Sequence, residues 1–219
     1  MEKYFDVLRR CKLFDGINDS ELKKMLTCLG AKTEFFDKKQ TVLGEGSPAT
    51  HIGIVLSGSV QVIQIDYYGN RNILMEAEES EMVAEAFACA ETEALPIAVV
   101  ANEPSEVMFI DCGHILHTCS NNCGFHQQMI FNLMKYLALK TIDFHKKLEI
   151  TSKRTTREKL LAYLSEYAKK AGKKRFRIPF DRQELADYLE VDRSGLSSEI
   201  SKMKKEGIID CNKNLFALI

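Results

Sequence analysis

The last third of the chain carries two helical stripes of apolar residues separated by a short turn. Within residues 180–209, Asp181 and Asp192 each stand directly before one stripe, where a short polar side chain can cap a helix. Glu184 adds the reciprocal capping residue to the first helix, and Gly207 is suited to end the second. The pattern predicts two capped helices joined by a tight turn. Their stripes consist of Leu185, Ala186 and Leu189, and of Leu196, Ile200 and Met203.

Short strand patterns flank this pair of helices. Residues 176–180 read as a strand that ends near a proline, and residues 208–219 read as strand, polar turn and strand. The turn is Asn212-Lys213-Asn214, which places Lys213 at the tip of a hairpin, where it suits a phosphate. A strand, two helices and a terminal hairpin together predict a winged helix-turn-helix.

The outward face of the second helix is rich in hydroxyl groups. Serine is a poor helix former without charge, so a row of serines adds little as a solvated surface but permits a close approach. Arg193, in the first turn, is a long forked donor, and arginine to guanine is the commonest specific contact in the major groove. The pattern favours DNA recognition over its alternative, an ordinary pair of packed helices. The outward face consists of Ser194, Ser197, Ser198, Ser201 and Lys205.

Charge is divided unevenly along the chain. Residues 146–219 hold 18 Lys+Arg against 11 Asp+Glu, whereas residues 1–145 hold 12 against 20, a division that the net charge of -1 conceals. A basic run just before the predicted motif suits phosphate neutralisation, although such runs also occur as solvated loops. The run consists of Lys169, Lys170, Lys173, Lys174, Arg175 and Arg177.

The first two-thirds of the chain begin with a helical segment and continue with a block of short strands. Residues 19–29 have helical spacing, and from Thr33 to Asp111 short apolar runs alternate with turns. Ile52, Ile54 and Leu56 show the alternation of a half-buried strand. Many short strands at this spacing predict a small antiparallel roll or barrel.

From residue 123 to residue 150 the apolar spacing becomes helical and approaches a heptad repeat. The stretch contains no proline and is long enough to pair with a second copy of the chain. We expect a two-chain coiled coil, because paired recognition helices usually read half-sites one DNA turn apart. The alternative is that this face packs on its own β-domain. The predicted dimer interface consists of Ile130, Leu133, Leu137, Phe144 and Leu148.

The order of these parts resembles the Crp/Fnr superfamily of bacterial transcription regulators. The resemblance extends over essentially the whole chain, through GEGSPATHIGIVLSGSV, the long helix, and TREKLLAYLSEYA followed by FDRQELADYLEVDRSGLSSEISKMKKEGII. It implies an α+β fold. The implied parts are an effector-sensing antiparallel β-roll of the cyclic-nucleotide-binding type at 1–122, a dimerisation helix at 123–150 and a winged helix-turn-helix at 151–219.

The resemblance also implies partners and site residues. It implies a homodimer on double-stranded DNA, which as an activator would contact RNA polymerase. Carried over by position, Arg182 and Gln183 would meet the DNA backbone. The residues that would face the bases are Arg193, Ser194, Ser197 and Ser198.

The chain departs from the members of that family that bind cyclic AMP. Those members hold the phosphate with a Gly-Glu and a downstream Arg-Ser, whereas this chain has Ala84-Glu85 and Leu95-Pro96. Burying an anion without a charged partner is costly, so the sequence argues against cyclic AMP as the effector. Ser194 and Ser198 replace the usual glutamate and arginine, so we expect a different operator.

A cluster of soft metal ligands lies between the predicted roll and the long helix. Cys112, Cys119, Cys123 and His126 follow one another within fifteen residues, and thiolates with an imidazole suit zinc or an iron–sulfur cluster, and less well haem. Their spacing matches no standard motif. The alternatives are a thiol-based redox switch and structural cysteines, the role expected of Cys28, Cys89 and Cys211.

The sequence lacks the motifs of membrane proteins, secreted proteins and several classes of enzyme. No stretch approaches the ~20 apolar residues of a membrane span, and the charged start does not resemble a signal peptide, so we expect a cytoplasmic protein without membrane contact. Nucleophile elbow, P-loop and dinucleotide motifs are absent, and His51 stands alone in its strand, which argues against an enzyme such as a cupin metalloenzyme. The alternative to a regulator is a roll that binds a ligand or metal without touching DNA.

Overall fold

The computed structural model describes residues 2–116 and 124–219, and the chain forms two compact units. The first unit holds residues 1–70 and 74–141, and the second holds residues 71–73 and 142–219. The division falls inside the long helix, whereas the sequence prediction starts the C-terminal domain at residue 151. No helix of the described parts is long and apolar enough to cross a membrane.

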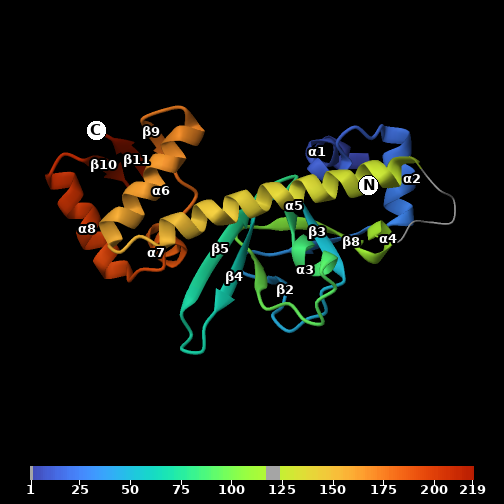
Figure 1. The fold of residues 1–219 in the computed structure, drawn as a ribbon, viewed down its shortest axis with the longest axis horizontal. Coiled ribbons are helices and arrows are strands. Elements are labelled where there is room, and N and C mark those ends of the chain that lie inside the picture. Colours follow the sequence, from blue (N-terminus) through green and yellow to red (C-terminus); the bar gives the residue numbers. More distant parts are fainter. Residues whose placement is uncertain (1, 117–123) are drawn as a thin grey trace. The chain divides into compact units, whose positions relative to one another are not determined.

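The N-terminal unit is built on two four-stranded sheets, which form the predicted antiparallel roll (Figure 1). The strand pairs β1–β8, β3–β8, β3–β6, β2–β7 and β4–β7 are all antiparallel. One sheet has the order β1(Lys32–Phe36), β8(Ser105–Asp111), β3(His51–Ser57), β6(Met82–Val83). The other has the order β2(Thr41–Leu43), β7(Ala98–Ala101), β4(Val60–Ile65), β5(Arg71–Ala77).

Alternate residues of β3 divide the N-terminal unit into two cores. Ile52 and Ile54 point into a core shared with the helices, whereas Val55 points into the interior of the roll, because successive side chains of a strand face opposite sides. The helices that cover the first core begin with η1(Glu2–Tyr4), α1(Phe5–Arg10), η2(Lys12–Phe14) and α2(Asp19–Cys28). α3(Glu85–Cys89) and α4(Gly113–Leu116) lie between and after the later strands.

The long helix α5(Gly124–Thr151) uses part of its apolar surface inside its own unit. Leu133 is 2% exposed and belongs to the helical core, and Ile130 and Leu137 pack against that core. Leu133 thus packs mainly within its own unit, as the alternative to a dimer contact describes, and Ile130 and Leu137 do so in part. The assignment of these residues to a dimer interface stays a prediction. Phe144 and Leu148 are exposed.

The C-terminal unit contains a winged helix-turn-helix. A three-stranded sheet of order β10-β11-β9 packs with three helices, and its β10–β11 hairpin is the predicted wing. Buried Leu196, Ile200 and Met203 form the predicted inner stripe of the second motif helix. The elements are α6(Thr156–Ala171), β9(Arg175–Arg177), α7(Arg182–Leu189), α8(Arg193–Lys205), β10(Ile209–Asn212) and β11(Leu215–Leu218).

Candidate nucleic-acid interface

The two motif helices begin at the caps that the sequence predicted. Asp181 Oδ1 accepts from the Glu184 backbone N–H at 2.9 Å, and Glu184 Oε2 accepts from the Asp181 N–H at 2.8 Å, so α7 has a complete capping box. Asp192 accepts from the N–H groups of Gly195 at 2.5 Å and Ser194 at 3.2 Å. These bonds, chiefly the one from Gly195, hold the pKa of the Asp192 carboxyl below its ordinary value. The capped, negatively charged start fixes the first turn of α8.

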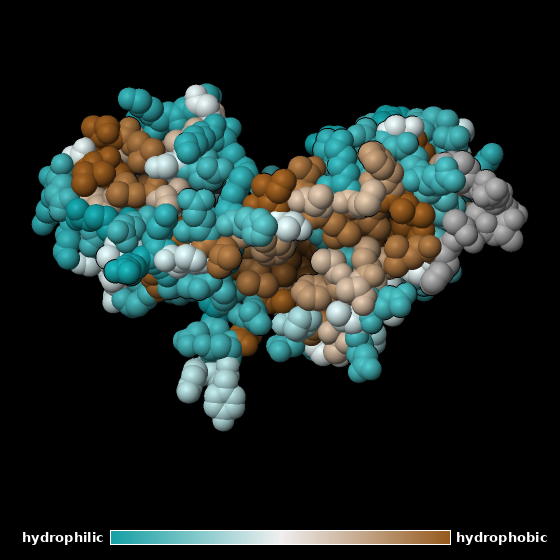
Figure 2. All heavy atoms as spheres, in the orientation of Figure 1, coloured by the Kyte–Doolittle hydropathy of each residue, from teal (hydrophilic) through white to brown (hydrophobic). Residues whose placement is uncertain are grey.

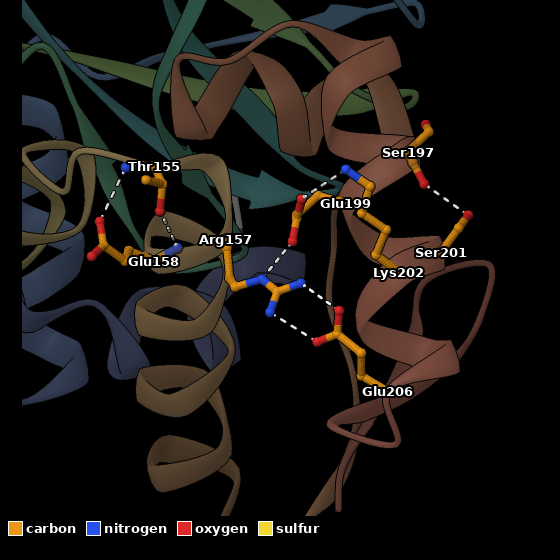
Figure 3. Close-up of polar contacts among 8 residues, drawn as sticks. All are labelled: Thr155, Arg157, Glu158, Ser197, Glu199, Ser201, Lys202 and Glu206. Carbon is orange, nitrogen blue, oxygen red and sulfur yellow. Dashed lines mark hydrogen bonds and ion pairs between the residues drawn. The ribbon is translucent and has the colours of Figure 1, made fainter.

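The two faces of α8 differ in exposure, because the predicted outward residues are mostly exposed and the apolar stripe is buried. Arg193, Ser198 and Lys205 are exposed, whereas Ser197 is half-buried. Two serines also bond within the motif. Ser194 Oγ donates to Asp192 Oδ2 at 3.0 Å. Ser201 Oγ donates to the Ser197 carbonyl at 2.9 Å, as Figure 3 shows. The start of α8 therefore exposes the long Arg193 side chain beside the short hydroxyl groups of Ser194 and Ser198. Short side chains of this kind permit a close approach to base edges.

One arginine of α6 ties that helix to α8. Arg157 Nε donates to Glu199 Oε1 at 2.5 Å, and its two terminal nitrogens donate to the Glu206 carboxylate at 2.8 and 2.9 Å (Figure 3). Glu199 also lies 3.9 Å from Lys202 Nζ. Such a planar fork needs a guanidinium, because lysine supplies a single point charge. No local sequence pattern predicted this contact, because Arg157 and Glu199 are 42 residues apart in the chain.

We expect Arg157→Lys to loosen α8 on α6 and to lower the temperature of the C-terminal unfolding transition. The reason is that lysine keeps the charge but cannot bond both carboxylates in the same fork. Arg154→Lys is the control, because Arg154 is exposed in the preceding loop. Differential scanning calorimetry would check the prediction, and equal melting curves for the two variants would contradict it.

The wing lies against the start of α7. Arg182 Nη2 donates to the Lys213 carbonyl at 3.4 Å, and its guanidinium lies 5.5 Å from the centre of the Phe216 ring. Lys213 has φ of 54°, the left-handed conformation of a tight turn, and its side chain is exposed at the tip. Gln183 is exposed and donates to Asp187 at 2.7 Å. The structure thus brings the predicted backbone-contacting residues Arg182 and Lys213 together.

The basic run before the motif spans the end of α6 and strand β9. All six of its side chains are exposed, which suits either a phosphate-contacting surface or a solvated one. Arg177 donates to Asn214 Oδ1 at 2.7 Å and so adjoins the wing hairpin. The six residues are Lys169, Lys170, Lys173, Lys174, Arg175 and Arg177.

The predicted effector positions lie in an apolar part of the roll. Ala84 and Leu95 belong to the interior core, and Leu95 exchanges backbone hydrogen bonds with Gly46 and Ser47, both at 2.9 Å. Pro96 is exposed. The Leu95 side chain is thus 2% exposed within a hydrophobic cluster.

Glu85 is a buried carboxyl group at the start of α3. It is 6% exposed, and burial raises its pKa to about 7, against a smaller opposing effect of Lys140. Ala84, directly before it, has φ of 62°, a left-handed conformation that positions the short helix. A neutral carboxylic acid is therefore present here at mildly acidic pH.

Only half of the predicted metal cluster lies within the described residues, because Cys119 and Cys123 fall outside them. Cys112 is buried, with its sulfur 3.6 Å from Cys89 Sγ, and His126 Nε2 lies 3.1 Å from the His114 carbonyl oxygen. Within residues 2–116 and 124–219, no three histidine, cysteine or acidic side chains are grouped as a metal site. The metal hypothesis stays a prediction.

Comparison with known proteins agrees with this architecture. A family model for the cyclic nucleotide-binding domain matches residues 33–122, and one for the Crp-like helix-turn-helix domain matches residues 158–218. The fold is similar to that of the c-di-GMP responsive global regulator CLP from Xanthomonas campestris, with 16% identity, coverage of 92% of this chain and 99% of that one, and a TM-score of 0.76. The fold is also similar to that of FixK2 from Bradyrhizobium japonicum, with 18% identity, coverage of 86% of this chain and 92% of that one, and a TM-score of 0.68. No curated protein sequence matches the chain.

A roll of the cyclic-nucleotide-binding type followed by a winged helix-turn-helix defines a two-domain transcription regulator rather than an enzyme. The two matched domains together extend over most of the chain, in the order that the sequence predicted. The chain belongs to the Crp/Fnr superfamily of transcription regulators.

Proposed function

We propose that the chain is a homodimeric, sequence-specific regulator whose α8 reads operator DNA and whose N-terminal domain responds to an effector other than cyclic AMP. The observation that supports the DNA half is the capped start of α8, where Arg193 is exposed beside Ser194 and Ser198. Arg193 reads a base edge, the serines permit its close approach, and Lys213 and Arg182 contact phosphates.

An unpartnered apolar face of α5 supports the dimer. Figure 2 shows apolar side chains gathered where α5 runs in Figure 1. Three pairs of these side chains lie about one turn apart, at positions 131 and 134, 139 and 142, and 144 and 148, so neighbouring turns of the helix each expose apolar surface. A second copy that pairs along this face supplies the second recognition helix. The exposed apolar residues are Phe131, Met134, Leu139, Ile142, Phe144 and Leu148.

The replaced phosphate contacts support an effector other than cyclic AMP. Leu95 stands where an arginine would neutralise the phosphodiester, and its side chain fills the roll interior instead. Placing an anion against this apolar cluster would leave the charge without a partner.

The DNA proposal is tested by two variants of the exposed cations. Arg193→Ala should lose discrimination at one base pair of each half-site, by about 1–3 kcal/mol, because the bidentate base contact is removed. Lys213→Ala should weaken binding to all sequences alike and lower the salt dependence by about one phosphate contact per protomer. Selection from random duplexes, followed by titrations at several salt concentrations, measures both effects. An unchanged sequence preference in Arg193→Ala would refute the assignment of the base contact.

A further inference from the structure

We propose that Cys89 and Cys112 form a reversible disulfide when the protein meets a hydroperoxide, and that this oxidation alters DNA binding. The thiol pair comes from two separate elements, because Cys89 ends α3 and Cys112 follows β8. The disulfide itself depends only on the pair, whereas its effect on DNA rests on the function proposed above.

The two sulfur atoms are already in contact. They lie 3.6 Å apart, and because a disulfide bond is about 2.05 Å long, they need to approach by about 1.5 Å. The cysteines are 23 residues apart in the chain. Their contact follows from the packing of α3 beside the end of β8 and not from a local sequence motif.

The two cysteines differ in exposure. Cys89 is half-buried, whereas Cys112 is 1% exposed. A cleft of about 390 Å³ lies on the Cys112 side of the pair, where Ala88, Thr92 and Cys112 line it in part. Because Cys89 is the more exposed of the two residues, a small oxidant reaches it first, and Cys112 lies beside it as the second thiol.

The chemistry balances with a hydroperoxide as the oxidant. The Cys89 thiolate attacks the terminal peroxide oxygen, the O–O bond breaks, and the products are a Cys89 sulfenic acid and an alcohol or water. The Cys112 sulfur, after losing its proton, then attacks Cys89 Sγ and expels the hydroxyl group as water. The two thiols are together oxidised by two electrons, which the peroxide accepts, and an added dithiol reverses the reaction by exchange.

The bond would act on the core that holds α5. Cys112 belongs to the same hydrophobic cluster as Met129 and Leu133 of α5. Its carbonyl accepts from the N–H groups of Ile115 at 2.9 Å and Leu116 at 3.0 Å, which anchors α4 to the same point. A bond that draws Cys112 toward α3 would therefore change the contacts of this cluster with α5, the helix that we propose as the dimer interface.

The test compares wild-type protein with three cysteine variants. Reduced, full-length protein is treated with hydrogen peroxide, free thiols are blocked, and peptides are mapped by mass spectrometry without reduction. We expect a Cys89–Cys112 peptide pair in wild type and in Cys28→Ser, whose replaced thiol is exposed elsewhere. The pair must be absent from Cys89→Ser and Cys112→Ser and must disappear after dithiothreitol. Because Cys112 is buried, Cys89→Ser decides the result if Cys112→Ser does not fold.

Operator binding by the same samples tests the regulatory consequence. Oxidation should change the affinity about fivefold or more in wild type and Cys28→Ser, and leave Cys89→Ser unchanged. Several results would overturn the proposal: Cys112 paired with Cys119 or Cys123, stoichiometric zinc or iron that is lost in Cys112→Ser, or a Cys89–Cys112 disulfide that leaves affinity unaltered. Reduced protein that binds no duplex would instead refute the proposed function, while the peptide map still decides whether the disulfide forms.

Discussion

Replacing Phe131 with glutamate is expected to separate the proposed dimer into monomers. Phe131 is 54% exposed on α5, so a charge there leaves the isolated chain folded but would be buried in the seam. Loss of a central apolar contact costs about 2 kcal/mol or more, which raises the dimer dissociation constant about 30-fold or more. Sedimentation over a series of protein concentrations would measure the change.

Phe35→Glu is the matched control for this experiment. Phe35 is 59% exposed on β1, so both variants exchange a similarly exposed phenylalanine for the same charge. The control should keep the wild-type dissociation constant. A dimer that survives Phe131→Glu would remove this face of α5 from the proposed interface.

Replacing Glu85 with glutamine is expected to stabilise the protein in a pH-dependent way. The carboxyl group has a pKa near its ordinary value of 4.5 in the unfolded chain and of about 7 in the folded chain. As the pH rises through this interval, the unfolded state loses its proton first, so the wild-type protein loses stability. Above about pH 7 the full difference of about 3 kcal/mol is reached, and below about pH 4.5 it vanishes.

Chemical denaturation of the full-length protein at several pH values would check this expectation. Glutamine nearly preserves the shape of the side chain and cannot ionise, so the gain should appear only toward alkaline pH. Glu93→Gln, at an exposed position, should follow the wild-type pH dependence. A gain for Glu85→Gln that is equal at all pH values would show that packing, rather than ionisation, is responsible.

The C-terminal unit could be predicted almost completely from local sequence. Asp181 with Glu184, and Asp192 alone, form the caps that their positions indicated, because a cap depends on residues within one turn. The buried stripe of α8 also follows from spacing alone. The wing was predictable from two short apolar runs around a polar turn, since a hairpin is a local structure.

The dimer face could not be assigned from spacing, because α5 has apolar residues on more than one side. Leu133 and Phe131 are only two positions apart, yet one is 2% and the other 54% exposed. A heptad pattern does not reveal which stripe meets the chain's own sheets. That choice depends on contacts such as the one from the Met82 N–H to Tyr136 Oη at 3.0 Å, across 54 residues.

The thiol site also required the fold. The sequence pattern grouped Cys112 with nearby candidate metal ligands. The structure instead places its sulfur against that of Cys89, the last residue of α3. Nothing in the spacing of 23 residues indicates such a contact. Glu85 shows the same limit, because an acidic residue at the start of a short helix is normally exposed, and only the surrounding layers make it buried.

The separation of faces on α8 has a consequence for how such regulators diverge. Ser198 and Lys205 are exposed, so exchanges there are expected to have little effect on folding, and under the DNA contacts proposed above they would alter operator preference. Gly195 is different, because a Cβ atom would lie 2.8 Å from Asp192 Oδ2 and disturb the cap. If the proposed contacts are right, the target sequence can change through a few outward positions, while Gly195 and Asp192 must be kept for the helix to begin in the same place.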